Sequence, residues 1–258
     1  MTFKPNPIPL LEYDPNPRSV INPEDFAHRF PTLPEHCVMC FFQDVIQNLV
    51  KGSEVEKLFD LGSEIGPNPV YQLDYEGKKV AFTHAGVGAP LSGAFLDELI
   101  GFGSKKFIAC GGAGVIETGS EMGSLYLPTG AIRDEGMSYH YLPADQPAVP
   151  HSAGLAAIES ILADRGVPYK KGLTWTTDAF YRETKDKVEH RRNQGCLTVE
   201  MEAAAFFAIA EFRQVTFAQI LYGGDDVSSE VWDNRSWHGA SSIREKLFWL
   251  AVESVCRL

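Results

Sequence analysis

Residues Thr198–Phe207 have the sequence TVEMEAAAFF. Alanine, methionine and glutamate favour helices, so this stretch predicts one. Met201, Ala205 and Phe212 recur at helical spacing and would give the helix an apolar stripe. Alanine and phenylalanine also occupy most of its remaining face, which predicts that the helix is buried against a core.

Two carboxylates, Glu200 and Glu202, fall in the first turn of this expected helix. One explanation is electrostatic, because free backbone N–H groups and the helix dipole favour negative charge at a helix N-terminus. The other is functional, because a buried charge is costly unless it has a partner. We favour the second interpretation, in which Glu200 and Glu202 are substrate-binding residues and a carboxylate binds ligand hydroxyls.

The composition excludes several classes of protein. The chain has 258 residues, is 44% hydrophobic and carries a net charge of −11. Binding to a nucleic-acid backbone needs clustered lysine and arginine, so nucleic acid is not an expected partner. No apolar run reaches membrane-spanning length, so a membrane is not expected either. The start of the chain does not resemble a signal peptide, and five scattered cysteines suit a reducing compartment, so we expect a cytoplasmic protein.

Residues 1–35 differ in composition from the rest of the chain. Eight prolines between Pro5 and Pro34 prevent a long helix there. We predict an extended proline-rich arm over residues 1–35 that wraps a neighbouring subunit. A single domain is expected to follow over residues 36–258, because no linker or internal repeat interrupts it.

Strand-like and helix-like segments alternate through this domain. The pattern predicts an α/β fold with a central twisted sheet, largely parallel but mixed by a hairpin at Tyr75–Gly77, and with helices on both faces. The expected strands are 37–42, 70–73, 79–83, 106–110, 124–129, 172–177 and 215–222, and the other expected helices are 44–51, 94–101, 152–165 and 241–256.

Two glycine-rich segments follow predicted strands. The first, with Gly86 and Gly88, precedes a helix and could cradle an anion or a polar ligand, or simply form a tight turn. The second holds Gly112, Ala113 and Gly114 and is expected to form a loop at the end of its strand, where open α/β sheets bind ligands. Neither has the Rossmann spacing, and no metal-ligand cluster is evident, so no organic cofactor or metal is expected.

In this order, these segments resemble the nucleoside phosphorylase family of purine nucleoside and uridine phosphorylases. The hydrolytic methylthioadenosine/adenosylhomocysteine nucleosidases belong to the same superfamily. The resemblance spans roughly residues 79 to 227, and its most specific feature is the Glu-Met-Glu-Ala sequence with an aspartate at the end of the next strand. The matching features are Gly86-x-Gly88-x-Pro90, Glu98-Leu99, Gly111–Gly114, Asp178-x-Phe180-Tyr181, Val199–Ala203 and Asp225.

The resemblance implies a phosphorylase/hydrolase-like fold, assembly into dimers or hexamers, and cleavage of a nucleoside N-glycosidic bond. It implies that Glu202 binds the ribose 2′- and 3′-hydroxyls and that Met201 packs on the sugar. Phe180 would stack on the base, and Asp225 would protonate it. These roles suit the chemistry, because cleavage passes through an oxocarbenium-like sugar that a carboxylate stabilises and releases a base that needs a proton.

Two further residues are candidates for the catalytic group. Asp226 is the alternative to Asp225, although neighbouring residues in an extended chain point in opposite directions. The pair could instead form a turn or cap the next segment. Arg235 lies in the following loop and is a candidate to assist the acid or to bind an anion. Its simpler interpretation is packing against the neighbouring tryptophans.

The sequence also departs from the family at the positions that bind phosphate. Arginine is absent after the first strand (Cys40–Val45), Ala109 replaces another arginine, and Gly112 replaces a hydroxyl residue. The segment Gly62–Val70 lacks the arginine that a neighbouring subunit supplies in many members, so an oxyanion loses its bidentate partners. The uracil-binding Gln and Arg are missing after Tyr181, which favours a purine or similar base.

Three functions therefore stay open. The first is a nucleoside phosphorylase with an atypical phosphate site and phosphate as co-substrate. The second is a hydrolytic nucleosidase that uses water, and the third is a non-catalytic nucleoside-binding protein. We favour an enzyme, because Glu202 and Asp225 are both present. Among the two enzymes, the sequence narrowly favours the phosphorylase.

Overall fold

The computed structural model describes residues 3–258 and contains a nine-stranded mixed sheet. The spatial order is β2-β3-β4-β1-β5-β8-β7-β6-β9, and β9 also pairs with β5, so the last five strands close on themselves. The strands are β1 (His36–Cys40), β2 (Val55–Ser63), β3 (Gly66–Tyr75), β4 (Lys78–His84), β5 (Lys106–Val115), β6 (Leu125–Asp134), β7 (Tyr169–Thr177), β8 (Cys196–Glu200) and β9 (Thr216–Asp226).

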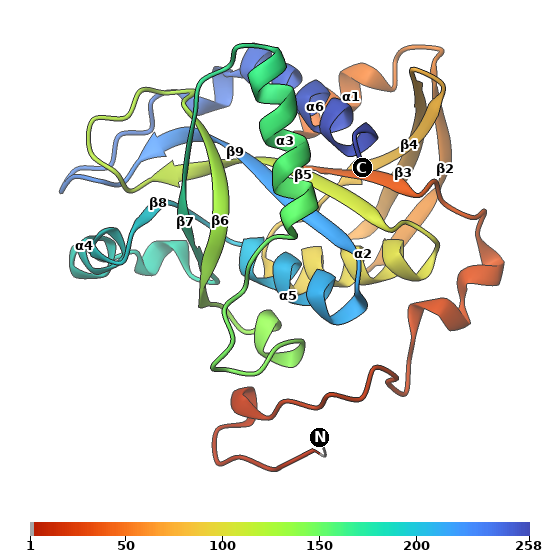
Figure 1. Cartoon of the computed structure of the whole chain (residues 1–258), viewed down its shortest axis with the longest axis horizontal. Coiled ribbons are helices and arrows are strands. Elements are labelled where there is room, and N and C mark those ends of the chain that lie inside the picture. The colour runs from red at the N-terminus through yellow and green to blue at the C-terminus, as the bar shows by residue number, and fades with distance from the viewer. Residues whose placement is uncertain (1–2) are drawn as a thin grey trace.

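Helices cover both faces of this sheet. One face carries α2 (Ala89–Gly101) and α5 (Ala203–Arg213), and the other carries α1 (Gln43–Leu49), α3 (Ser152–Asp164) and α6 (Ser241–Cys256) (Figure 1). The remaining helix, α4 (Lys185–Asn193), lies beside the closed end of the sheet. No helix among residues 3–258 combines the length and apolar character needed to cross a membrane.

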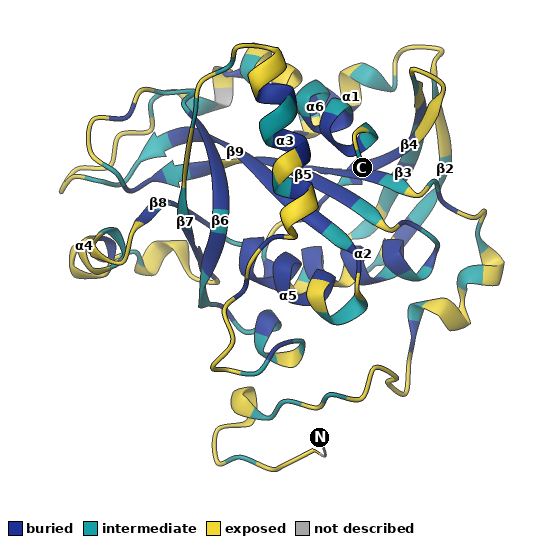
Figure 2. Cartoon of the chain, in the orientation of Figure 1, coloured by how far each residue is buried: buried dark blue, intermediate teal, exposed yellow. Residues whose placement is uncertain are grey.

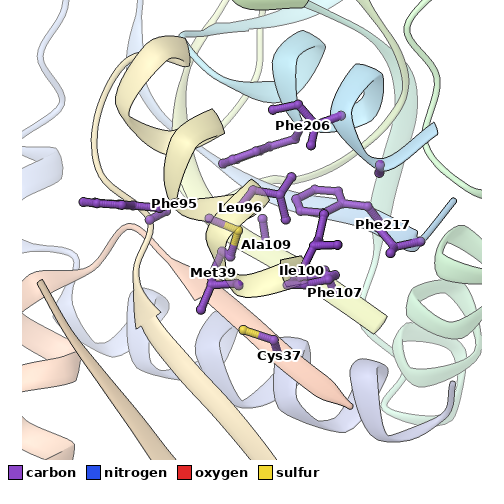
Figure 3. Packing of buried hydrophobic residues seen from close by; sticks show 14 of the residues in the cluster. Cys37, Met39, Phe95, Leu96, Ile100, Phe107, Ala109, Phe206 and Phe217 are labelled. Carbon is purple, nitrogen blue, oxygen red and sulfur yellow. The ribbon is translucent and has the colours of Figure 1, made fainter. Parts of the chain in front are cut away.

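The core is divided into layers by the sheet. Between the sheet and α2 and α5, the side chains of Met39, Phe107, Ala109, Phe206 and Phe217 pack together (Figure 3). A second cluster fills the space under α3 and α6. The central strands and the inner faces of the helices are therefore almost wholly buried, whereas β2 and β3 are mostly half-buried or exposed and the N-terminal segment is mostly exposed (Figure 2).

These elements confirm the α/β prediction and the hairpin. Strands β3 and β4 pair antiparallel around Glu76 and Gly77. The helix expected at 241–256 is α6 with the same bounds. Strands β2 and β8 and helix α4 were not anticipated, and β6 extends to Asp134 instead of ending near residue 129.

The stretch Thr198–Phe207 is not one continuous helix. Strand β8 ends at Glu200 and helix α5 begins at Ala203, so both glutamates precede the helix instead of lying in its first turn. Pairing with β7 explains the difference, because Thr198 and Glu200 lie opposite Thr174 and Thr176. Tertiary strand pairing here overrides the helix propensity of glutamate and methionine.

The second glycine-rich segment is also a strand and not a loop. Strand β5 continues through Gly112 and Ala113 to Val115, because these residues pair with Tyr222 and Gly223 of β9. The strand expected over 215–222 likewise extends to Asp226 as β9. Glycine weakens strands on its own, so this extension is imposed by pairing between distant parts of the chain.

The N-terminal segment is extended apart from short 3₁₀ turns, including η1 (Pro9–Leu11). It is fixed to the domain by a hydrogen bond from Arg213 Nη1 to the Pro17 carbonyl (3.0 Å) and another from Ser104 Oγ to the Pro34 carbonyl (2.8 Å). Residues 1–2 of the expected arm lie outside the described residues. That the arm wraps a neighbouring subunit stays a prediction.

Candidate active site

A group of carboxylates gathers where parallel strands β6, β7 and β8 end. Glu135 follows β6, Asp178 follows β7, and Glu200 and Glu202 lie at the end of β8. The carboxyl ends of parallel strands share one edge of a sheet, which explains why residues so distant in sequence converge. The loop between β4 and α2 closes this group from the other side through Gly88.

Glu202 joins the N-termini of α5 and α2. It occupies the N-cap position of α5, and its Oε1 accepts a hydrogen bond of 2.6 Å from the backbone N–H of Gly88, the N-cap residue of α2. Its side chain is buried, with 6% of the residue exposed. Burial raises the pKa of Glu202, and the negative charge of Glu200 raises it further, while the Gly88 and Met201 amides oppose the shift.

Glu200 supports Glu202 instead of facing a ligand. Its Oε2 accepts hydrogen bonds from the backbone N–H groups of Glu202 (2.8 Å) and Ala203 (2.6 Å), and its Oε1 accepts one from the Thr176 hydroxyl (2.6 Å). Burial raises the pKa of Glu200, against the effect of these donors. Both oxygens of Glu200 are thus bonded within the fold, and its substrate-binding role stays a prediction.

Glu135 and Asp178 were not singled out as ligand groups by sequence reasoning. The Glu135 carboxylate is buried and accepts the Ser138 amide (3.0 Å), while Asp178 Oδ2 accepts the Gly136 amide (2.9 Å). Burial raises the pKa of Glu135, and Asp178 adds to that shift. A residue that directly follows a strand of an open α/β sheet is a candidate ligand-binding residue. Glu135 meets this criterion because β6 ends at Asp134, but the strand was expected to end near residue 129.

Asp225 and Asp226 point in different directions, as alternation along β9 requires. Asp225 Oδ2 accepts the indole N–H of Trp232 at 2.7 Å. Its Oδ1 lies beside Gly114, where an added Cβ would be 3.6 Å away. Gly114 also faces Val199 of β8, so Asp225 lies next to the strand that leads to Glu202.

Asp226 and Arg235 organise the loop after β9. Asp226 Oδ1 accepts the Ser228 amide at 2.7 Å, and its Oδ2 pairs with the Arg235 guanidinium. Arg235 also lies 3.8 Å from Asp233 Oδ2, and its backbone has φ 46°, an uncommon conformation for a non-glycine residue. The structure thus brings Arg235 to Asp226 and not to Asp225, and its assistance to the catalytic acid stays a prediction.

Phe180 and Glu183 lie on the same short segment, facing β9. Phe180 belongs to η5 (Phe180–Arg182), is 51% exposed and stacks on Tyr181 at 4.1 Å between ring centroids. Burial and the negative charge of Asp225 raise the pKa of Glu183 to about 7. Sequence reasoning missed Glu183, because nothing in the local pattern signals its approach to Asp225.

The predicted glycine positions have different surroundings. Gly86 has φ +81°, and a Cβ there would lie 3.1 Å from Leu91. Gly112 is exposed, and a Cβ there would lie 3.1 Å from the Tyr222 ring. Ala113 is buried in a small cluster with Val115. Among the four predicted glycine-segment residues, Gly114 is the one beside Asp225, whereas Gly86 lies two residues before Gly88, which bonds Glu202.

At the edge where β4, β1 and β5 end, the aromatic ring of Phe41 lies beside His84, and Arg244 reaches the neighbouring β9, where it bonds the Tyr222 hydroxyl (3.2 Å). Arg244 also pairs with Asp44, which follows β1. The Phe41 ring packs on Gly111 and lies 6.4 Å from the His84 ring, edge-on. Ala109 is fully buried among apolar side chains (Figure 3). His84 Nδ1 accepts the Gly86 amide at 3.1 Å, and burial lowers the pKa of His84, which keeps the ring neutral. These are the positions where the resemblance would place phosphate-binding arginines.

Within residues 3–258, no group of three or more histidine, cysteine, aspartate or glutamate side chains is arranged to hold a metal ion. The carboxylate groups are instead bonded to backbone amides and hydroxyls, as at Glu200 and Glu135.

Comparison with known proteins agrees with this arrangement. A model of the phosphorylase superfamily matches residues 35–241. A guanosine phosphorylase of Halorubrum lacusprofundi is 30% identical over 162 residues, which are 60% of this chain and 67% of that protein. A uridine phosphorylase of Thermococcus kodakarensis is 29% identical over 173 residues, and the match spans 61% of this chain and 62% of that protein.

The structure of an AMP nucleosidase from Bacteroides thetaiotaomicron superposes with a TM-score of 0.72 at 21% identity, covering 90% of this chain and 94% of that one, so the fold is shared.

Proposed function

Because the chain belongs to the phosphorylase superfamily, we propose that it is an enzyme that cleaves the N-glycosidic bond of a ribonucleoside. The observation that carries this proposal is the hydrogen bond between Glu202 and Gly88, which fixes a buried carboxylate beside Met201. A carboxylate held this way can accept hydrogen bonds from two neighbouring ribose hydroxyls. The names of both relatives, a guanosine and a uridine phosphorylase, agree with a nucleoside substrate.

The ribose side of the site stabilises positive charge. As the glycosidic bond breaks, the sugar becomes oxocarbenium-like, and a carboxylate nearby offsets that charge at low dielectric. Glu200 holds the backbone amides of Glu202 and Ala203, so the carboxylate of Glu202 is oriented before substrate arrives. Little reorganisation is then needed during the reaction.

The base side of the site supplies the proton. We assign this role to Asp225, whose Oδ2 is oriented by the Trp232 indole N–H. Phe180 presents an exposed ring on which a base can stack. We prefer Asp225 to Asp226 because the Asp226 carboxylate is already paired with Arg235 and accepts the Ser228 amide.

For the acceptor of the ribosyl group, the geometry favours water. Phe41 and His84 lie at the edge where phosphate would need cationic partners, and Ala109 is buried within β5. Arg244, which reaches Tyr222 beside this edge, is already paired with Asp44. The protein would then be a hydrolytic nucleosidase. Phosphorolysis is the second candidate, and the names of the two relatives favour it. In that case backbone amides would have to replace the arginines.

The test is release of free base from a panel of purine and pyrimidine nucleosides, with and without phosphate. Ribose formed at a rate independent of phosphate would support hydrolysis. Ribose 1-phosphate formed only with phosphate would establish phosphorolysis instead. Binding of nucleosides without release of any base would overturn both enzyme proposals and favour a binding protein.

A further inference from the structure

The N-terminal arm lies against its own domain beside the carboxylates of the candidate site. We propose that the arm acts within its own chain as a strap that fixes the turn at residues 135–141 and so keeps Glu202 oriented toward the ribose. Leu10 of the arm and Arg213 of α5 are then positioning residues. The inference rests on the proposed function, because it concerns the ribose end of the same site.

The turn at residues 135–141 is packed tightly against two helices. It follows β6 and contains η4 (Met137–His140), which lies against both α5 and α2. The Met137 side chain reaches α2 so closely that a Cβ added to Gly93 would lie 2.9 Å from its Cε atom. The turn therefore has one side fixed by the core.

The arm covers the same turn from another direction. Its 3₁₀ turn η1 lies against η4 (Figure 1). A Cβ added to Gly136 would lie 3.7 Å from Leu10 Cδ1 and 3.8 Å from Asp178 Oδ2. Leu10 thus borders the point at which the backbone of the turn bonds the Asp178 carboxylate.

One buried network holds both the arm and the end of the turn. Arg213 donates to Asp97 of α2 through Nε (2.7 Å) and Nη2 (2.9 Å), and the Tyr141 hydroxyl donates to the same carboxylate (2.9 Å). Asp97 is only 8% exposed. The remaining terminal nitrogen of Arg213, Nη1, donates to the carbonyl of Pro17 in the arm (3.0 Å). Release of Arg213 would therefore loosen the arm and the turn together.

The arm also has a defined path between these contacts and the sheet. Asn22 is buried and donates to the Ser19 carbonyl at 2.9 Å. Directly after it, η2 (Pro23–Asp25) packs on α2, where a Cβ added to Gly101 would lie 2.5 Å from Pro23. This packing leaves no room for a side chain at Gly101, so the arm is seated on its own α2.

The turn is connected to Glu202 through Asp178. In the parallel pair β7–β8, Thr176 lies opposite Glu200, and Asp178 and Glu202 each follow by two residues. Asp178 Oδ2 accepts the Gly136 amide at 2.9 Å, which restrains a negative charge next to the carboxylate that would bind the ribose. A loosened turn would free this charge to approach Glu202, and a nearby like charge disfavours an ionised carboxylate.

The first experiment measures kcat and KM of the full-length Leu10→Ala variant. The substrates are the ribonucleoside that the wild type cleaves best and its 2′-deoxy analogue. We expect kcat/KM for the ribonucleoside to fall about 10-fold, mainly through KM, because a misplaced carboxylate grips the hydroxyls poorly. The 2′-deoxy analogue should change much less, whereas a general loss of stability would affect both substrates equally.

The control is Ile8→Ala, which shortens a 57% exposed side chain of the same arm and should leave both substrates unaffected. An unchanged ratio of the two substrates in Leu10→Ala would overturn the positioning role. So would an equal change in Ile8→Ala. A melting temperature measured for each variant confirms that it is folded.

A second experiment tests whether the strap acts within one chain. Leu10→Ala is co-expressed with Glu202→Gln, so that no chain carries both an intact arm and an intact Glu202. We expect the mixture to keep the reduced kcat/KM of Leu10→Ala at the sites that contain Glu202. Restoration of the wild-type value would show that the arm of a neighbouring subunit supplies Leu10, and would overturn the inference.

A third experiment needs no activity. Trypsin can cut after Arg18, which is exposed and adjoins the Pro17 carbonyl that Arg213 holds. Arg213→Lys keeps the charge but loses the forked donors, so we expect cleavage after Arg18 to become several times faster. An unchanged rate would overturn the strap even in an inactive protein. Failure of the wild type to cleave any nucleoside would instead overturn the proposed function, and the positioning role with it.

Discussion

The Oε1 atom of Glu202 lies 2.6 Å from the backbone nitrogen of Gly88, although 114 positions separate the two residues. This contact connects the start of α5 with the start of α2 and places a buried carboxylate at the edge of the sheet. The hydrogen bond fixes one oxygen of the carboxylate. The geometry of the site therefore depends on both the loop and the helix.

The first prediction concerns the carboxylate itself. Glu202→Gln keeps the shape of the side chain but removes the negative charge that would offset the oxocarbenium-like sugar. We expect kcat/KM for nucleoside cleavage to fall by about 100-fold or more. Steady-state kinetics on the best substrate measures this. Glu211→Gln, an exposed residue on the same helix, is the control, and equal losses in both variants would contradict the assignment.

The second prediction concerns the loop that holds Glu202. Gly88 has φ +86° with no neighbouring atom that a Cβ would meet, so Gly88→Ala costs about 1–2 kcal/mol through backbone conformation alone. Gly77 in the β3–β4 hairpin has a similar φ of +79° and equally open space. We expect similar losses of unfolding free energy in urea for the two alanine variants. Activity should fall only in Gly88→Ala, and an equal fall in Gly77→Ala would disprove the role of the loop.

The third prediction separates the two adjacent aspartates. Asp225→Asn removes the group assigned to protonate the base, so kcat should decrease by about 100-fold or more with little change in nucleoside affinity. Asp226→Asn instead breaks the ion pair with Arg235 and loosens the loop after β9. It should lower the melting temperature and spare most of kcat. The reverse pattern, measured by kinetics and thermal unfolding, would transfer the role to Asp226.

The fourth prediction is a dependence of stability on pH. The ordinary pKa of glutamate is 4.5, and burial with the charge of Asp225 raises the pKa of Glu183 to about 7 in the folded protein. The contribution of Glu183 to stability is therefore full at pH values below 4.5 and is lost as pH rises through 7. Relative to Glu183→Gln, the wild type should lose unfolding free energy between about pH 5 and pH 8. Urea unfolding of both proteins at several pH values tests this, and parallel curves would exclude the shift.

Much of the fold could be predicted because it depends on local pattern. The hairpin around Gly77 and the bounds of α6 follow from turn residues and helical periodicity. The predictions of secondary structure were wrong where strand pairing overrides the local propensity of a segment. Glu200 lies in a strand because β7 lies beside it, and Gly112 lies in a strand because β9 does.

In the candidate site, too, some features could be predicted from the sequence and others are visible only in the structure. The Glu-Met-Glu-Ala sequence could be identified in advance, but the separate roles of its glutamates could not. Glu200 caps α5 and bonds Thr176, whereas Glu202 reaches Gly88. Likewise, only the structure places Arg235 on Asp226, and only the structure reveals Glu183 opposite Asp225.

The sequence by itself determined the α/β class, the order of most elements and the residue types available for chemistry, because these follow from periodicity and composition within short windows. The tertiary structure alone decided which carboxylates are bonded within the fold and which face the site. It also decided that the Phe41 ring and His84 lie side by side at the end of β1 and β4. The physical reason is that burial, hydrogen bonding and charge proximity at this edge arise from segments of different strands, whose contacts are formed by long-range pairing of the sheet.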